Sequence, residues 1–284
     1  MCWNLLRNLC IVALFIMISL SFSIKTAYAN ISLISQMTQS FDVIEGESYQ
    51  GLLKLYNNGD QVQDVRIYQT DYRFDAEGHS FYEKASTLAR SNANWIEINN
   101  SIVSVPPKDS INLLYKVIVP EDKKLVGTYW SMIMVEPLPI RDSRGSANSL
   151  MEKEQDVKIG VKQSFRYGVQ IVTNVGDDGK YKLNFTNSKL RYDEKRDGYI
   201  FQVDLINKGE YWLSPMVWME IYDDYGSQVG RFKGKQLRIY PDTSIRQQIR
   251  VAKLRAGTYQ VLLIADNQDD NIFGIRYTLK VTEP

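Results

Sequence analysis

The segment VKIGVKQSFRYGVQIVTN, Val157 to Asn174, alternates between apolar and polar residues over most of its length. One set of alternate positions is mainly apolar and consists of Val157, Ile159, Val161, Gln163, Phe165, Tyr167, Val169 and Ile171. The positions between them are occupied mainly by lysine, arginine, glutamine, serine and glycine. Successive side chains of a β-strand point to opposite faces of the sheet, so this period of two predicts one strand with an apolar face. The predicted strand is far longer than the usual ~5–6 residues.

The same pattern, in shorter pieces, fills most of the remaining chain. Further strands are predicted at Gly51–Tyr56, Gln61–Tyr72, Trp95–Ile98, Ile102–Val105, Ile111–Val119, Gly127–Val135, Tyr181–Phe185, Tyr199–Ile206, Val217–Tyr222, Gln236–Tyr240, Ile245–Val251, Gly257–Ala265 and Phe273–Val281. Turn residues such as Asn58-Gly59 and Asp197-Gly198 separate them. Many short strands at such spacing are typical of β-sandwiches. We therefore predict an all-β protein with two immunoglobulin-like (Ig-like) β-sandwich domains in tandem and an inter-domain cleft.

The order of the strand runs predicts the domain organisation. We expect a signal peptide at residues 1–29, an N-terminal Ig-like domain at 30–173 and a C-terminal Ig-like domain at 174–284. The first domain is expected to contain a long loop at 140–156, which is polar and lacks periodicity, and the alternating strand at 157–172.

Two short tags recur in both halves of the chain. The tag LYNNG at Leu55–Gly59 resembles LINKG at Leu205–Gly209, and the tag GTYW at Gly127–Trp130 resembles GTYQ at Gly257–Gln260. In each half the first tag lies early and the second lies late. This echo favours two copies of a related fold.

The first 29 residues have the features of an export signal. Arg7 precedes an apolar run from Cys10 to Phe22, and Ala27-Tyr28-Ala29 has the small-x-small pattern of a signal-peptidase site. The run is short for a membrane span, which needs about 20 residues, and no second apolar stretch follows. We expect an exported protein of the periplasm, with the cell surface as the alternative, and no membrane span after signal cleavage.

Charge and cysteine content exclude several classes of function. The 34 Lys and Arg residues nearly balance the 33 Asp and Glu residues, whereas binding to nucleic acid calls for a basic excess. Both cysteines, Cys2 and Cys10, lie in the predicted signal peptide. The mature chain is therefore expected to have no nucleic-acid partner, no disulfide and no thiol chemistry.

Residues suited to catalysis are scarce. His79 is the only histidine and lies in a predicted turn, and no motif of a hydrolase, a zinc site or a phosphate loop is present. The acidic runs Asp223–Asp224 and Asp266–Asn271 are interpreted as solvated turns. A calcium site or a glycan-directed pair of carboxylates remains the alternative for such residues. We expect no catalytic residue, no metal site, no cofactor and no enzymatic activity.

An exported pair of Ig-like domains, with a long alternating strand that leads into the inter-domain region, resembles the periplasmic pilus assembly chaperone (PapD-like) family. In that family the alternating strand closes the first domain and lends apolar side chains to a pilin subunit that lacks a strand of its own. Backbone hydrogen bonds then supply affinity and alternate side chains fill pockets. The resemblance implies a chaperone-like protein that binds β-rich pilus or envelope subunits by β-strand donation.

The resemblance also implies which residues bind the partner. These are Val157, Ile159 and Val161 as strand donors, Lys162 and Arg166 as polar anchors, and Phe165, Arg166 and Tyr167 at the end of the donor strand. At that end the family places a basic residue that captures the terminal carboxylate of the subunit, and Arg166 matches it. The implied partners are a pilin-like subunit with an incomplete Ig-like fold and an outer-membrane usher.

Two features depart from the family. A second basic residue of the cleft belongs on the first strand, but Asn30 to Glu47 contain no Lys or Arg. The first domain also carries an insert, Tyr72 to Ser91. The alternative function is a structural or adhesive Ig-like protein of the cell envelope, which would bind a surface partner without strand donation.

Overall fold

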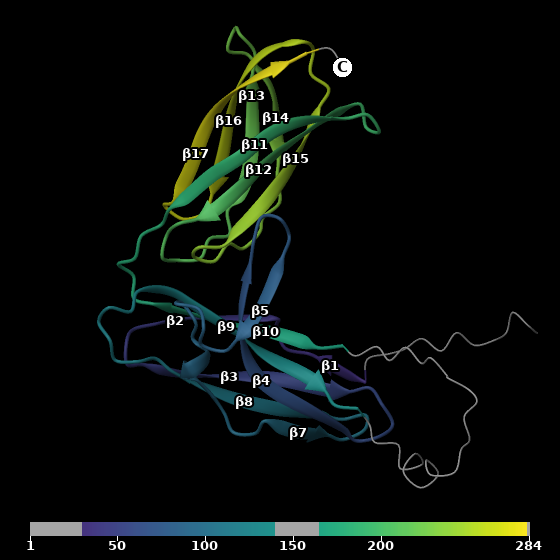
Figure 1. Ribbon diagram of the computed structural model, residues 1–284, viewed down its shortest axis with the longest axis vertical. Helices are drawn as coiled ribbons and strands as arrows, with labels where there is room; N and C mark the ends of the chain where they lie inside the picture. The colour runs from purple at the N-terminus through teal and green to yellow at the C-terminus, as the bar shows by residue number, and fades with distance from the viewer. Residues whose placement is uncertain (1–29, 140–164, 283–284) are drawn as a thin grey trace, which may run out of the picture.

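The computed structural model describes residues 30–139 and 165–282. In these two ranges the chain forms four β-sheets and one short 3-10 helix, η1 (Ala93–Trp95). The sheets pair into two sandwiches, and the second stands at an angle on one sheet of the first (Figure 1). The prediction of an all-β fold with two tandem sandwiches is confirmed. Over the described ranges, no helix has the length and apolar character that crossing a membrane requires.

The first sandwich contains the strands from β1 to β10. Their bounds are β1 (Ile31–Leu33), β2 (Thr38–Val43), β3 (Ser48–Asn57), β4 (Gln63–Phe74), β5 (Ser80–Lys84), β6 (Ile96–Ile98), β7 (Ile102–Val105), β8 (Ser110–Ile118), β9 (Gly127–Pro137) and β10 (Tyr167–Val175). One sheet has the order β1-β3-β8-β6. The other has the order β2-β10-β9-β4-β5, with β7 also paired to β4.

The second sandwich contains the strands from β11 to β17. Their bounds are β11 (Leu183–Asp193), β12 (Gly198–Asn207), β13 (Met216–Tyr222), β14 (Gln228–Lys233), β15 (Ser244–Ala252), β16 (Gly257–Asp266) and β17 (Ile272–Val281). The sheet β11-β12-β15 packs on the sheet β14-β13-β16-β17 around a core that includes Phe201, Leu205 and Met219.

β10 corresponds to the later part of the predicted alternating strand. It pairs antiparallel with β9 and parallel with β2, and it continues to Val175, beyond the expected strand end at residue 172. The extension exists because residues Thr173 to Val175 still pair with both neighbouring strands. The first part of the prediction, residues 157–164, and the predicted loop at 140–156 lie outside the described residues.

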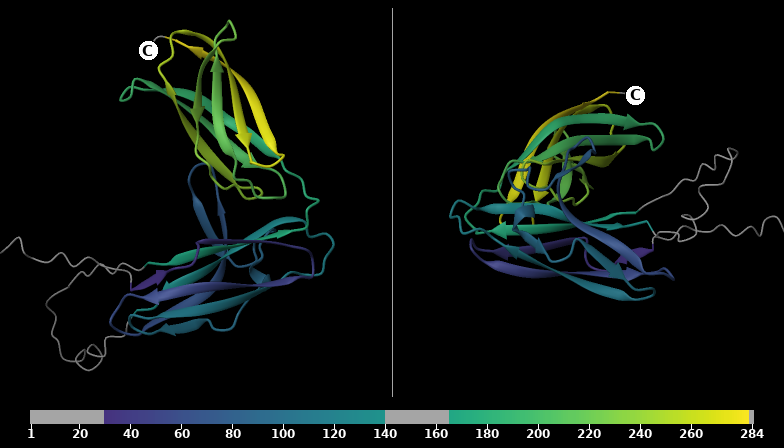
Figure 2. Two further views of the ribbon diagram at one scale, coloured as in Figure 1. Left: turned by 180° about the vertical axis from the view of Figure 1, so that it is seen from behind. Right: turned by 60° about the horizontal axis from the view of Figure 1, so that its bottom comes forward.

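The period of two in β10 separates two faces. Val169 and Ile171 are fully buried in the core of the first sandwich. Gly168, Gln170 and Val172 alternate with them and therefore face away from that core, toward the second sandwich. The sheet that contains β10 is the one turned toward the second sandwich (Figure 2).

The recurrent asparagine tags occupy equivalent turns. Asn57 at the end of β3 donates its side-chain amide to the carbonyls of Gln61 and Val105. Asn207 at the end of β12 donates in the same way to Tyr211 and Ile239. The repeated sequence thus marks a repeated hydrogen-bonded turn in the two sandwiches.

Several contacts join the sandwiches. At the joint, the Thr128 amide donates to the Glu210 carbonyl at 2.7 Å. Farther out, the β4–β5 hairpin rises from the first sandwich (Figure 1), and its Ala76 amide donates to Ser244 Oγ at 2.9 Å. The insert noted in the sequence therefore also contacts the second sandwich.

Candidate partner-binding site

Among the described residues, the start of β10 is unpaired along one edge. β2 pairs with β10 only from Gln170 onward, where the Gln170 amide donates to the Met37 carbonyl at 2.9 Å. Backbone groups alternate in direction along a strand, so those of Gly168 and Arg166 point to the same side as those of Gln170. Within the described residues, no strand pairs with that side at Gly168 or Arg166.

The free edge arises from the path of the first strands. β1 pairs with β3 in one sheet, and after Leu33 the chain crosses to the other sheet, where β2 begins at Thr38. β2 therefore covers only the later part of β10. Among the described residues, nothing pairs with the earlier part on that side, and extended peptides bind to sheet edges of this kind.

A hollow of about 580 Å³ lies on the outer face of the sheet beside this edge. Its floor follows the register of three strands, since Gly168 on β10 pairs with Met134 on β9, which pairs with Tyr68 on β4. Tyr72 and its cross-strand partner Tyr82 on β5 also line the hollow. The outer face therefore combines thioethers and phenol rings beside the unpaired edge of β10.

Arg166 lies at the rim of this hollow. Its side chain is exposed and donates a hydrogen bond to the Tyr68 hydroxyl, which, with the nearby carboxylate of Glu136, raises the pKa of Arg166 above its usual value. The guanidinium is therefore charged and accessible at any physiological pH. A guanidinium can bind a carboxylate with two parallel hydrogen bonds.

The other residues predicted to bind a partner fall into two groups. Val157, Ile159, Val161 and Lys162 lie outside the described residues. Phe165 is 43% exposed beside Arg166. Tyr167 turns to the opposite face, where its hydroxyl donates to the Ile31 carbonyl at 2.7 Å and its ring packs on the core of the first sandwich.

Sequence reasoning missed the tyrosines and methionines of the hollow. Tyr68 and Tyr72 share one face of β4 with Thr70, and the period of two in that strand could have placed them together. Met132 and Met134 lie in a strand of nearly continuous buried residues, in which the sequence shows no polar alternation. Their place in the site depends on which strands pair, and this the sequence does not reveal.

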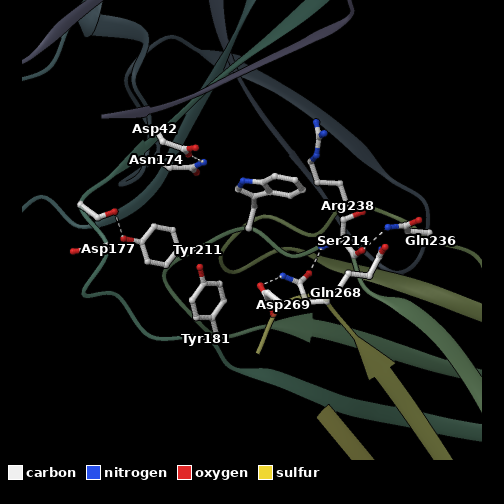
Figure 3. Close-up of a pocket in the computed structure, with 13 residues that line it drawn as sticks. Asp42, Asn174, Asp177, Tyr181, Tyr211, Ser214, Gln236, Arg238, Gln268 and Asp269 are labelled. Atoms are coloured by element: carbon white, nitrogen blue, oxygen red, sulfur yellow. Dashed lines mark hydrogen bonds between the residues drawn. The ribbon is translucent and has the colours of Figure 1, made fainter. Parts of the chain in front are cut away.

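A second hollow, of about 660 Å³, lies at the joint between the sandwiches (Figure 3). Its polar side chains largely bind one another or nearby backbone. Asn174 donates to Asp42 at 2.7 Å, and the Tyr211 hydroxyl donates to the Gly176 carbonyl at 2.6 Å. Arg238 lies over the Trp212 ring, 4.6 Å from its centre. These contacts hold the joint together, and we assign this hollow a structural role.

Aspartates in the acidic turns accept hydrogen bonds from backbone amides of the same turns. Asp223 accepts hydrogen bonds from the amides of Tyr225 and Ser227, and Asp269 accepts from the amide of Asn271. Asp75, Glu77 and His79 approach within 4.8 Å of one another at the tip of the β4–β5 hairpin. There the hydrogen bond to Asp75 raises the pKa of His79.

No protein-family model matches the chain, and no curated protein matches it either. Several fimbrial chaperones are among the solved structures similar to it. A chain from a chaperone–tip adhesin complex of CFA/I fimbriae is 13% identical, with a TM-score of 0.47 over 88% of this chain and 98% of that one. The class 5 fimbriae chaperone CfaA is 12% identical, with a TM-score of 0.47 over 89% and 100%. The E. coli chaperone DraB is 11% identical, with a TM-score of 0.40 over 88% and 98%.

These likenesses concern the arrangement of strands. With identities of at most 13% and TM-scores below 0.5, they leave the function to be argued from the geometry of this chain. In that geometry, β2 leaves the start of β10 unpaired among the described residues, and the Arg166 guanidinium lies beside this unpaired edge.

Proposed function

We propose that this chain is an exported, chaperone-like protein that binds a β-rich pilus or envelope subunit by β-strand pairing. The single observation that carries the proposal is the edge of β10, which β2 leaves unpaired before Gln170. An open edge offers unpaired backbone donors and acceptors, and a subunit that lacks a strand can complete its sheet there.

Arg166 supplies the second part of the proposal. It lies where the open edge meets the hollow, so it would bind the terminal carboxylate of a strand that pairs along β10. β2 contributes no second cation, and the hollow instead offers the hydroxyl groups of Thr38 and Tyr68. Neutral hydroxyl donors form weaker bonds to a carboxylate than charged donors do. Arg166 therefore carries most of the electrostatic attraction.

The donor side chains of the proposal are Val157, Ile159 and Val161, which precede β10 on the apolar set of alternate positions, with Lys162 as a further polar anchor. The partner would be a pilin-like subunit with an incomplete Ig-like fold, in the periplasm, and an outer-membrane usher would receive the complex. We propose that the first domain, expected at 30–173, extends to the end of β10 at Val175, that the second domain follows it up to residue 284, and that 1–29 is removed as a signal peptide.

Recovery of the partner from the native envelope tests this function. We compare the tagged wild-type protein with a double variant, I159D and V161D, and identify the bound proteins by mass spectrometry. The control introduces the same residue at the alternate positions, K158D and G160D. We expect the donor-face variant to lose the partner while circular dichroism shows it folded, because aspartate cannot fill an apolar pocket. The control variant should keep the partner.

The variant R166M tests the carboxylate anchor separately. Because Arg166 is exposed in the free protein, its pair with a carboxylate is screened by water, and the affinity should fall by roughly fivefold to tenfold. A partner that stays bound to the donor-face variant would show that binding does not use strand donation. That result would favour the adhesive alternative.

A further inference from the structure

The hollow beside Arg166 has a floor that glycine keeps open. A Cβ atom on Gly168 would lie 2.9 Å from Met132 Sδ and 3.2 Å from Met134 Sδ. Both thioether side chains are therefore packed against the β10 backbone, and they are only 5% and 7% exposed. Any side chain at position 168 would occupy the space above the two sulfur atoms.

Phenol rings form the walls of the hollow. The rings of Tyr72 and Tyr82 lie 5.4 Å apart in a tilted pair, and Tyr82 is 59% exposed, so much of its surface is free for contact. Sulfur atoms and aromatic edges make favourable contacts with another aromatic ring. The lining therefore suits an aromatic side chain better than a small or a polar one.

The described residues that line the hollow carry one charge. Of the described residues that line the hollow, Arg166 alone is charged, since the others are methionine, tyrosine, threonine, glutamine and glycine. A ligand that fits must combine an anionic group at the rim with an apolar body inside. In a polypeptide, a carboxylate and a side chain are joined through a single Cα only at the last residue.

On the basis of the proposed function, we infer that this hollow selects the last side chain of the partner subunit, and that it favours an aromatic one. Arg166 would hold the terminal carboxylate, while the aromatic ring would lie over Gly168 and the sulfur atoms, between the tyrosine rings. The specificity residues are then Gly168, Met132, Met134, Tyr72 and Tyr82. Strand pairing itself needs none of these side chains.

Synthetic peptides test this inference directly. The probe is a fluorescein-labelled octapeptide with alternating valine and threonine, which ends in phenylalanine, alanine or aspartate as the free acid, or in phenylalanine amide. Fluorescence anisotropy gives the dissociation constants. We expect the phenylalanine acid to bind about tenfold tighter than the alanine acid, a difference of ~1.4 kcal/mol. The aspartate acid should bind no better than the alanine acid.

Two variants separate the parts of the site. G168A should remove the preference for phenylalanine over alanine and keep the preference for acid over amide, because the new methyl group forces the sulfur atoms into the hollow. R166M should do the reverse. The matched control is G274A on β17, where a Cβ atom would meet nothing closer than a backbone oxygen at 3.6 Å. It should leave both preferences unchanged.

The outcomes distinguish this inference from the function on which it rests. If the phenylalanine and alanine acids bind equally, and both bind more tightly than the amide, the selective hollow is wrong and the anchor at Arg166 stands. If phenylalanine is preferred but acid and amide bind equally, the hollow stands and the anchor is wrong. If no free-acid peptide binds the wild-type protein, both are wrong.

Discussion

Tyr240 joins the two sandwiches through one buried side chain. It is 1% exposed, its hydroxyl donates to Gln170 Oε1 at 2.5 Å, and its ring stacks on Trp130 with the ring centres 4.6 Å apart. Burial raises the pKa of Tyr240 from 10.0 to about 12. The neutral phenol is therefore part of the contact between the sandwiches.

This raised pKa predicts a loss of stability at alkaline pH. The unfolded chain releases the phenol proton near pH 10.0 and the folded chain near pH 12. Stabilisation by the neutral Tyr240 is complete below the lower value and is lost as pH rises through the higher one. Within that window the free energy of unfolding should fall by up to about 1.4 kcal/mol per pH unit from this group.

Urea unfolding between pH 8 and pH 11.5 measures the effect. Y240F should show a shallower fall than the wild type, since phenylalanine has no proton to release. Y225F is the control, because Tyr225 is 95% exposed in a hairpin turn, and it should follow the wild-type curve. Equal slopes for Y240F and the wild type would contradict the assignment.

The β4–β5 hairpin is the part of the first sandwich that carries the insert and contacts Ser244 of the second sandwich. Its base is held by Asp71, which is fully buried and accepts hydrogen bonds from the amides of Ser86, Thr87 and Leu88. The Ser91 hydroxyl also donates to this carboxylate. One side chain therefore ties the segment after β5 to the sheet that carries Tyr68 and Tyr72.

D71N tests this role. The amide group keeps one acceptor and turns an NH₂ group toward backbone donors, so amide hydrogens remain buried and unpaired. We expect the free energy of unfolding to fall by about 2–4 kcal/mol. We also expect faster proteolysis at residues 86–91. D64N is the control, because Asp64 is exposed and accepts from Ser104 Oγ, and it should change stability by less than about 1 kcal/mol. Equal losses in the two variants would contradict the role of Asp71.

The relation of the two sandwiches depends on a close backbone approach at Gly127. This residue has φ of +89°, and a Cβ atom there would lie 2.2 Å from the Glu210 carbonyl oxygen in the second sandwich. Only glycine permits both the left-handed backbone and the short distance. The close approach of the two backbones at this joint therefore requires glycine.

G127A should move the sandwiches apart. The left-handed backbone costs roughly 1–2 kcal/mol with alanine, and the clash with a carbonyl adds to it. The control is G226A, where φ is +80° but nothing lies within 4 Å of the added Cβ atom, so it carries the backbone strain alone. We expect G127A, but not G226A, to increase the radius of gyration in small-angle X-ray scattering. An unchanged radius for G127A would show that the joint does not depend on this contact.

Much of the fold could be predicted from local patterns. The period of two marked the strands, and the recurrent asparagine tags marked two equivalent turns, because a turn uses residues close in sequence. β1, β2, β5 and β14 were not among the predicted strands, and the strand predicted at Gln236–Tyr240 is wrong, because this segment forms only an isolated bridge between Ile239 and Leu213. β5 lies in the insert Tyr72–Ser91, which was recognised as an addition to the first domain and received no strand. The partner-binding role of Arg166 came from the family resemblance, and it stays a prediction.

The site itself shows the limit of such patterns. Alternation along β10 assigns Gly168 to the face opposite Val169, and this holds in the structure. It does not say that Met134 and Tyr68 lie beside Gly168, since three separate strands bring them together. Nor does it say that β2 begins only at Thr38 and leaves the start of β10 unpaired. Side-chain direction follows from the geometry of one strand, whereas neighbours, edges and hollows follow from long-range pairing, and only the folded chain decides these.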